Sequence, residues 1–123
     1  MSKILVIEDD ALNRDLASRI LTRRGHEVVL AENGETGILM AASEDPDIIL
    51  LDLAMPDMDG FETARRIKAA SPTGDIPIIA LTAFAAREVT KDRALEAGCD
   101  DFDTKPIDSQ RLLAKIDALL AAS

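Results

Sequence analysis

The chain has 123 residues, of which 47% are hydrophobic, enough for one folded domain and too hydrophobic for a disordered chain. Its formal net charge of −9 argues against direct binding to nucleic acid or to an anionic membrane, because both need a positive face. The single cysteine, Cys99, and the lack of a signal peptide or of ~20 consecutive apolar residues predict a cytoplasmic protein without membrane insertion.

The first strand–helix unit begins near the N-terminus. Residues 4–7 are a run of β-forming residues that ends at the acidic residues 8–10, which predicts a buried strand. A helix is expected next and should end before Gly25, since basic residues precede this glycine. Its predicted apolar face consists of Leu12, Leu16, Ile20 and Leu21.

Two further units follow the same plan. A strand over 28–31 precedes a helix that Asn33 opens, and a strand over 48–51 ends at an acid, Asp52. After a loop, Asp59 is expected to cap the third helix, in an arrangement much like a capping box.

The last two units complete the pattern. A strand over 78–81 ends at Thr82, and a helix is expected over 87–97. The strand over 101–104 has the weakest pattern, and Asp108 caps the final helix. Five strand–helix units in a row predict an α/β fold with a parallel sheet covered on both faces. We expect a single domain over residues 1–123, with no output domain.

Polar side chains stand where the predicted strands end. They are Glu8, Asp9, Asp10, Asp52, Thr82 and Lys105. Ligands of open parallel sheets bind beyond these carboxyl ends, so the fold should gather the six residues at one edge. Clustered carboxylates repel one another unless a cation is present, and Mg²⁺ suits oxygen ligands together with phosphate. With a lysine and a hydroxyl nearby, the set fits phosphoryl transfer to Asp52 as nucleophile.

Four motifs carry a family resemblance, and they occur in order over most of the chain. They are residues 6–10 (VIEDD), 50–60 (LLDLAMPDMDG), 80–83 (ALTA) and 104–106 (TKP). In these motifs the chain resembles the receiver domain of bacterial two-component response regulators. That resemblance implies a flavodoxin-like doubly wound sheet with strand order 2-1-3-4-5.

The resemblance also implies the function of the site. Asp52 would accept a phosphoryl group from a sensor histidine kinase or a His phosphotransfer protein. Mg²⁺ would be held by Glu8, Asp9, Asp52 and the backbone carbonyl of Ala54, with Glu8 acting directly or through water. The protein would then be a signalling switch rather than an enzyme, with at most slow self-dephosphorylation.

Three further positions belong to the implied switch. Lys105 would pair with Asp52 or with the phosphoryl oxygens, and the peptide bond before Pro106 would be cis. Thr82 would move to bond a phosphoryl oxygen, Phe102 would follow it inward, and a downstream protein would recognise the changed surface.

The chain departs from the commonest receiver pattern at a few positions. Glu8 stands where Asp is frequent, and Phe102 where Tyr is also common. Ala54 and Phe84 should flank the path of the attacking water and tune the phosphoryl lifetime, in a direction that the sequence does not give. A finer similarity, to the DivK type of single-domain regulator and to receivers of hybrid kinases, rests on residues 12–13 and 81–85.

Other interpretations remain open for several residues. Asp9 and Asp10 alone would suit helix caps. His26 is expected to be an exposed turn residue, and Cys99 a small buried apolar residue. An aspartate-nucleophile phosphatase is a competing function, although such enzymes place a second Asp where this chain has Ala54. A module that binds its partner without phosphorylation is a third.

Overall fold

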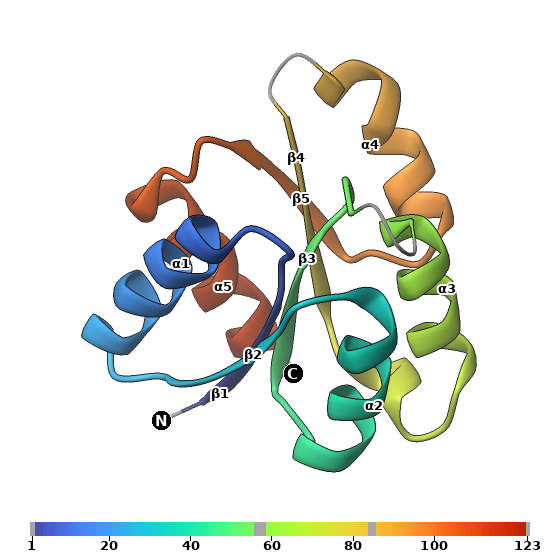
Figure 1. Cartoon of the computed structure of the whole chain (residues 1–123), viewed down its shortest axis with the longest axis horizontal. Helices are drawn as coiled ribbons and strands as arrows, with labels where there is room; N and C mark the ends of the chain where they lie inside the picture. The colour runs from blue at the N-terminus through green and yellow to red at the C-terminus, as the bar shows by residue number, and fades with distance from the viewer. Residues whose placement is uncertain (1, 56–58, 84–85, 123) are drawn as a thin grey trace.

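The computed structural model describes residues 2–55, 59–83 and 86–122, and of residues 87–89 only the backbone. Five parallel strands form one sheet in the order β2-β1-β3-β4-β5, as predicted (Figure 1). The strands are β1 (Lys3–Ile7), β2 (Glu27–Ala31), β3 (Ile48–Asp52), β4 (Ile78–Ala83) and β5 (Asp101–Lys105).

Helices cover both faces of this sheet. They are α1 (Ala11–Arg23), α2 (Gly34–Glu44), α3 (Gly60–Ala69), α4 (Arg87–Glu96) and α5 (Ser109–Ala122), with a short 3-10 helix, η1 (Thr73–Asp75). Helices α1 and α5 lie on one face, and α2, α3 and α4 on the other (Figure 1). The predicted three-layer α/β fold is confirmed.

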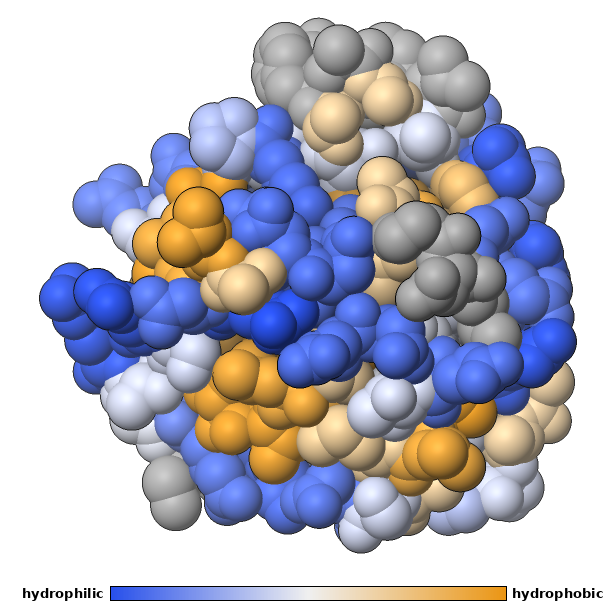
Figure 2. Space-filling view, in the orientation of Figure 1, coloured by the Kyte–Doolittle hydropathy of each residue, from blue (hydrophilic) through white to orange (hydrophobic). Residues whose placement is uncertain are grey.

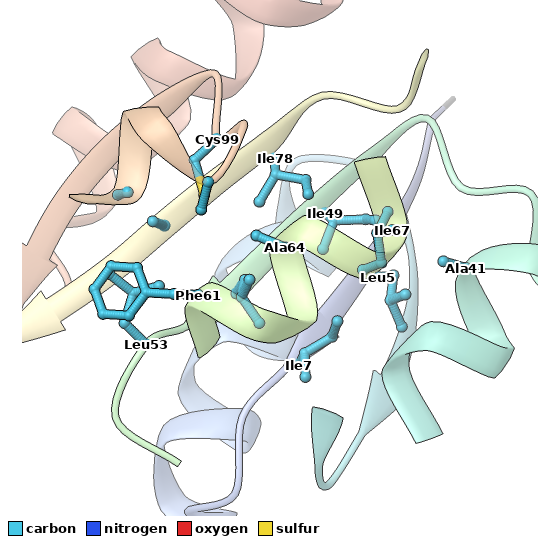
Figure 3. Packing of buried hydrophobic residues seen from close by; sticks show 14 of the residues in the cluster. Leu5, Ile7, Ala41, Ile49, Leu53, Phe61, Ala64, Ile67, Ile78 and Cys99 are labelled. Atoms are coloured by element: carbon cyan, nitrogen blue, oxygen red, sulfur yellow. The ribbon is translucent and has the colours of Figure 1, made fainter. Parts of the chain in front are cut away.

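Two hydrophobic clusters hold the layers together. Alternate residues of a strand point to opposite faces, so the apolar strands supply both clusters. On one side Ile49 and Ile78 of the sheet pack against Ala64 and Ile67 of α3 (Figure 3). On the other side Leu50 lies in a cluster with side chains of α1 and α5. The central strands are therefore buried on both faces, and Cys99 is buried as expected.

Side-chain caps begin most of the helices where the sequence indicated. The carboxylate of Asp59 accepts a hydrogen bond from the Glu62 amide at 3.0 Å, and Asp108 accepts one from the Arg111 amide at 3.0 Å. Asn33 caps α2 through the amide of Thr36 at 2.8 Å. These bonds satisfy amides that have no partner within the helix.

The predicted apolar face of α1 is wrong in part. Leu21 is buried with Ala17, whereas Leu12 is 81% exposed and Leu16 is 43% exposed. Leu12 and Leu21 are nine residues apart, which is about two and a half helical turns, so they point in opposite directions. The buried face therefore centres on Ala17 and Leu21, and the other leucines form a separate exposed stripe.

The prediction for His26 is also wrong. Both ring nitrogens are shielded from solvent, and neither has a hydrogen-bond partner among the described residues. The histidine follows Gly25, whose φ of 91° turns the chain back toward the sheet. The residue is half-buried, with its ring nitrogens facing the protein rather than solvent.

The visible surface is mainly hydrophilic, with separate hydrophobic patches (Figure 2). Of the helices in the described part of the chain, none combines the length and the hydropathy that crossing a bilayer requires.

Candidate functional site

Three carboxylates meet where β1 and β3 end. The two strands are parallel neighbours, with Ile7 opposite Leu51, so the residues that follow them emerge side by side. Glu8 and Asp9 come directly after β1, and Asp52 is the last residue of β3. One carboxylate oxygen from each of the three lies within 4.8 Å of the others. The predicted cluster is therefore present.

Lys105 reaches this cluster from the end of β5. Strand β4 lies between β3 and β5, and Ala83 pairs with Lys105 at the same edge of the sheet. The Lys105 Nζ lies 2.8 Å from Glu8 Oε1 and 3.0 Å from Asp52 Oδ2. Its long side chain thus spans one strand and places a positive charge between two buried carboxylates.

The close packing of these charges moves their pKa values in different directions. Burial, reinforced by the neighbouring Asp52 carboxylate, raises the pKa of Glu8 to about 7, despite the opposing effect of Lys105. Burial also acts to raise the pKa of Asp52, but hydrogen bonds from Glu8, the Ala54 amide and Lys105 outweigh it and lower that pKa. Asp52 is therefore the ionised carboxylate of the pair, and Glu8 carries a proton up to near-neutral pH.

The lysine itself remains charged. Burial alone would lower the pKa of Lys105, but its bonds to Glu8 and Asp52 raise it. The group available to a ligand at this site is therefore an ammonium ion next to an ionised aspartate.

The two acids that follow Glu8 have different roles. Asp10 caps α1, since its carboxylate accepts hydrogen bonds from the Leu12 and Asn13 amides at 2.8 and 3.1 Å. Asp9 is exposed and contributes its carboxylate to the cluster. The helix-cap interpretation thus holds for Asp10, and the geometry of Asp9 fits metal binding.

The remaining predicted positions lie around this cluster. Thr82 is buried in β4, and Phe102 is half-buried in β5. The amide of Ala54 donates to Asp52 Oδ1 at 3.1 Å, and Ala54 itself is exposed. The peptide bond between Lys105 and Pro106 is cis, as expected. Phe84, predicted to flank the water path, lies outside the described residues.

Gly60 brings the start of α3 against the end of β3. A Cβ at Gly60 would stand 2.5 Å from the Leu53 Cα and 2.8 Å from the Asp52 carbonyl oxygen. Its amide also donates to the Leu53 carbonyl at 3.3 Å. The backbone that carries Asp52 is therefore packed against a position that only glycine fits.

Two arginines that bind segments next to the site residues were missed by the sequence reasoning. Arg14 of α1 donates to the backbone carbonyls of Glu8 and Asp9, both at 2.9 Å, and so holds the acidic loop. Arg111 of α5 bonds Asp103, a buried carboxylate, at 2.6 Å. The sequence offered one indication of this role. Arg14 lies near the start of α1, where the helix dipole favours acidic rather than basic side chains, so a basic residue there calls for a partner.

These residues fit a divalent cation and a phosphoryl group. Carboxylate oxygens are hard ligands, which Mg²⁺ prefers, and phosphate oxygens complete its coordination in many sites. The ammonium of Lys105 can neutralise the charge of a phosphoryl group held at Asp52. The arrangement can therefore position an anion next to a nucleophilic carboxylate.

Comparison with known proteins identifies the family of this chain. Residues 4–117 match the family described as the response regulator receiver domain. Protein PilH of Pseudomonas aeruginosa is 36% identical over 121 residues, which cover 98% of this chain and 99% of PilH. The DNA-binding dual master transcriptional regulator RpaA of Synechocystis is 39% identical over 98% of this chain, and the match spans 49% of RpaA.

Solved structures share the fold at lower sequence identity. A putative response regulator from Chloroflexus aurantiacus superposes with a TM-score of 0.92 at 28% identity, over 98% of each chain. The receiver domain of the sensor histidine kinase PA1611 from Pseudomonas aeruginosa has a TM-score of 0.90 at 30% identity, again over 98% of each chain. That structure has a magnesium ion coordinated in its active site cleft.

Receiver domains are signalling switches rather than classical enzymes, they bind Mg²⁺ in the active site, and they interact with histidine kinases or phosphotransfer proteins. The match over nearly the whole chain, to the family and to PilH alike, assigns the protein to this group. The chain belongs to the response regulator receiver domain family of two-component signalling.

Proposed function

We propose that Asp52 is the phosphoacceptor of this receiver domain and that Glu8, Asp9 and Asp52 bind Mg²⁺ together with the Ala54 backbone carbonyl. One observation carries the proposal: the three carboxylates converge within 4.8 Å, with the Lys105 Nζ 3.0 Å from Asp52. The lowered pKa of Asp52 supports its role, because a nucleophilic carboxylate must be ionised.

The reaction follows from the position of Asp52. A carboxylate oxygen of Asp52 attacks the phosphorus of a phosphohistidine on the donor kinase or phosphotransfer protein. An oxygen–phosphorus bond forms as the phosphorus–nitrogen bond breaks, and the histidine nitrogen takes up a proton. When bound, Mg²⁺ supplies positive charge to the phosphoryl oxygens. Lys105 pairs with another phosphoryl oxygen and so stabilises the acyl phosphate.

The signal then passes through Thr82 and Phe102. The Thr82 hydroxyl donates to a phosphoryl oxygen, Phe102 moves inward, and a downstream protein binds the altered surface. Catalysis is limited to slow loss of the phosphoryl group from Asp52. Residues 1–123 act as one unit, because both hydrophobic clusters are built on the same sheet. A cytoplasmic location is also proposed, supported by the free thiol of Cys99.

Acetyl phosphate, a small phosphoryl donor, tests the proposal without a kinase. In the presence of Mg²⁺ the intact protein should gain the mass of one phosphoryl group. Asp52→Asn and metal chelation should each abolish the gain, because the nucleophile or the cation is then missing. Asp117→Asn is the matched control, since Asp117 of α5 forms an exposed ion pair with Arg24 at the end of α1.

Uptake that persists in Asp52→Asn, or that is unaffected by chelation, would contradict the proposed site. Many turnovers on a small phosphomonoester would instead favour the phosphatase alternative. Transfer from a histidine-phosphorylated protein, measured with the same variants, tests the proposed class of donor.

A further inference from the structure

The Thr82 hydroxyl has a neighbour in α4. The hydroxyl oxygens of Thr82 and Thr90 lie 3.3 Å apart. Thr82 is 4% exposed, and Thr90 is half-buried one turn into α4. The side chain that is proposed to bind the phosphoryl group is therefore in contact with α4.

Counting protons shows which hydroxyl donates. The Thr90 hydroxyl has one proton, and the carbonyl oxygen of Ala86, four residues earlier, lies only 2.9 Å from Thr90 Oγ1. This shorter contact to a carbonyl, typical of threonine within a helix, takes the Thr90 proton. A hydrogen bond between the two hydroxyls then uses the proton of Thr82 and a lone pair of Thr90.

A phosphoryl oxygen needs that same proton. It carries no hydrogen of its own at neutral pH in an aspartyl phosphate, so it can only accept from Thr82. Thr82 cannot donate its single proton to Thr90 and to the phosphoryl group at once. The two acceptors compete.

We propose that Thr90 is a positioning residue that holds the Thr82 hydroxyl in the unphosphorylated orientation by accepting its proton. This inference rests on the proposed function, in which Thr82 donates to a phosphoryl oxygen. It adds Thr90 as a residue that opposes this movement of Thr82. When Thr82 turns to the phosphoryl group, β4 loses its hydrogen bond to α4. The state of Asp52 is thereby communicated to the first turns of α4.

Removal of the Thr90 acceptor should favour the phosphorylated orientation. The probe is beryllofluoride, a phosphoryl mimic, whose affinity in the presence of Mg²⁺ is measured by isothermal titration calorimetry. Thr90→Val keeps the shape and removes the hydroxyl, and should bind the mimic about 2- to 10-fold more tightly, the range of one hydrogen bond. Thr90→Ser restores an acceptor and should return the affinity to that of the wild type.

Thr63→Val is the matched control. Thr63 is a buried threonine of α3 whose hydroxyl also donates to a carbonyl four residues earlier, that of Asp59, at 3.3 Å. The contact with the Thr82 hydroxyl is made by Thr90 and not by Thr63. Its substitution should remove the same kind of helix bond without tightening the binding of the mimic.

A double-mutant cycle assigns the effect to Thr82. In a Thr82→Val background, Thr90→Val should leave the affinity unchanged, because no proton is left to compete for. Thr90→Ala, which suits a helix, replaces Thr90→Val if the valine variant does not fold.

The outcomes separate the two proposals. Equal affinities for wild type and Thr90→Val, or a gain that persists without the Thr82 hydroxyl, overturn the role of Thr90 and leave the proposed function standing. If the wild type itself does not bind the mimic with Mg²⁺, the proposed function fails and the role of Thr90 fails with it.

Discussion

Glu8 and Asp52 are adjacent buried carboxylates that titrate differently. Both are 2% exposed, and both contact Lys105. One lysine stabilises one full negative charge well, and the second carboxylate is then better protonated. The site without metal therefore favours a proton on Glu8, and a divalent cation must displace that proton to use Glu8 as a ligand.

This competition predicts how the stability of the metal-free protein depends on pH. The pKa of Glu8 is raised from 4.5 to about 7 in the folded protein, so its proton stabilises the fold below pH 4.5. That contribution is lost as the pH rises through 7. The opposite shift of Asp52 acts at lower pH, because its contribution is lost only as the pH falls through a lowered pKa.

We expect the free energy of unfolding of wild type in chelator, relative to that of Glu8→Gln, to fall between pH 4.5 and 7. Urea denaturation at several pH values measures the difference. Glutamine cannot lose a proton in this range, so its own curve is the reference. Parallel curves for the two proteins would contradict the protonation of Glu8.

The residues of the site differed in how well the sequence predicted them. Glu8, Asp52 and Lys105 were identified because each stands at the end of a strand, where topology alone brings them together. Arg14 and Thr90 were not, because their roles depend on the direction of one side chain on a helix. The direction of a side chain depends on how the helix packs against the sheet, and the order of residues in the sequence does not give that packing.

At the scale of elements, the order and type of the five strands and five α-helices in the described part of the chain were predicted correctly. Strand and helix boundaries shifted by one or two residues; β4, for example, extends through Thr82 to Ala83. The apolar face of α1 was predicted wrongly because its leucines were grouped without regard to the angle between their positions around the helix axis. Turns with unusual backbone were also missed, as at Asp45, where φ is 49°.

The junction of β3 and α3 allows a prediction about Gly60. Gly60→Ala would place a methyl group against the backbone of Leu53 and Asp52, which cannot move without displacing β3. We expect a loss of about 1–3 kcal/mol in the free energy of unfolding, the usual cost of overpacking. Urea denaturation measures it.

Gly37→Ala provides the comparison. A methyl group there would meet the side chain of Ile7 at 2.5 Å, and a side chain can rotate away. Alanine also favours the helix in which Gly37 lies. A loss for Gly37→Ala as large as that for Gly60→Ala would show that contact with backbone is not the decisive difference.

At the scale of the molecule, binding of Mg²⁺ to the folded state should stabilise the whole domain. The proposed ligands lie at the ends of β1 and β3, whose side chains contribute to both hydrophobic clusters, so we expect the site and the core to unfold together. Linkage then predicts about 2.7 kcal/mol at a concentration 100-fold above the dissociation constant. Thermal unfolding with increasing MgCl₂ measures the effect.

The net charge of −9 requires a control, because any salt screens repulsion among the acids. KCl at matched ionic strength accounts for screening. Asp9→Ala removes an exposed ligand without disturbing the core, and its melting temperature should follow ionic strength alone. Equal responses of Asp9→Ala and wild type to MgCl₂ would argue against a specific site.

The ion pair between Glu8 and Lys105 joins positions that are 97 residues apart. During synthesis, the N-terminal half of the pair leaves the ribosome long before its partner exists. A nascent or truncated chain that lacks β5 has the carboxylates of Glu8 and Asp52 but not the Lys105 ammonium ion that lies between them. The charges of the cluster are thus balanced only once β5 has joined the sheet, so the cluster depends on the last strand to be made.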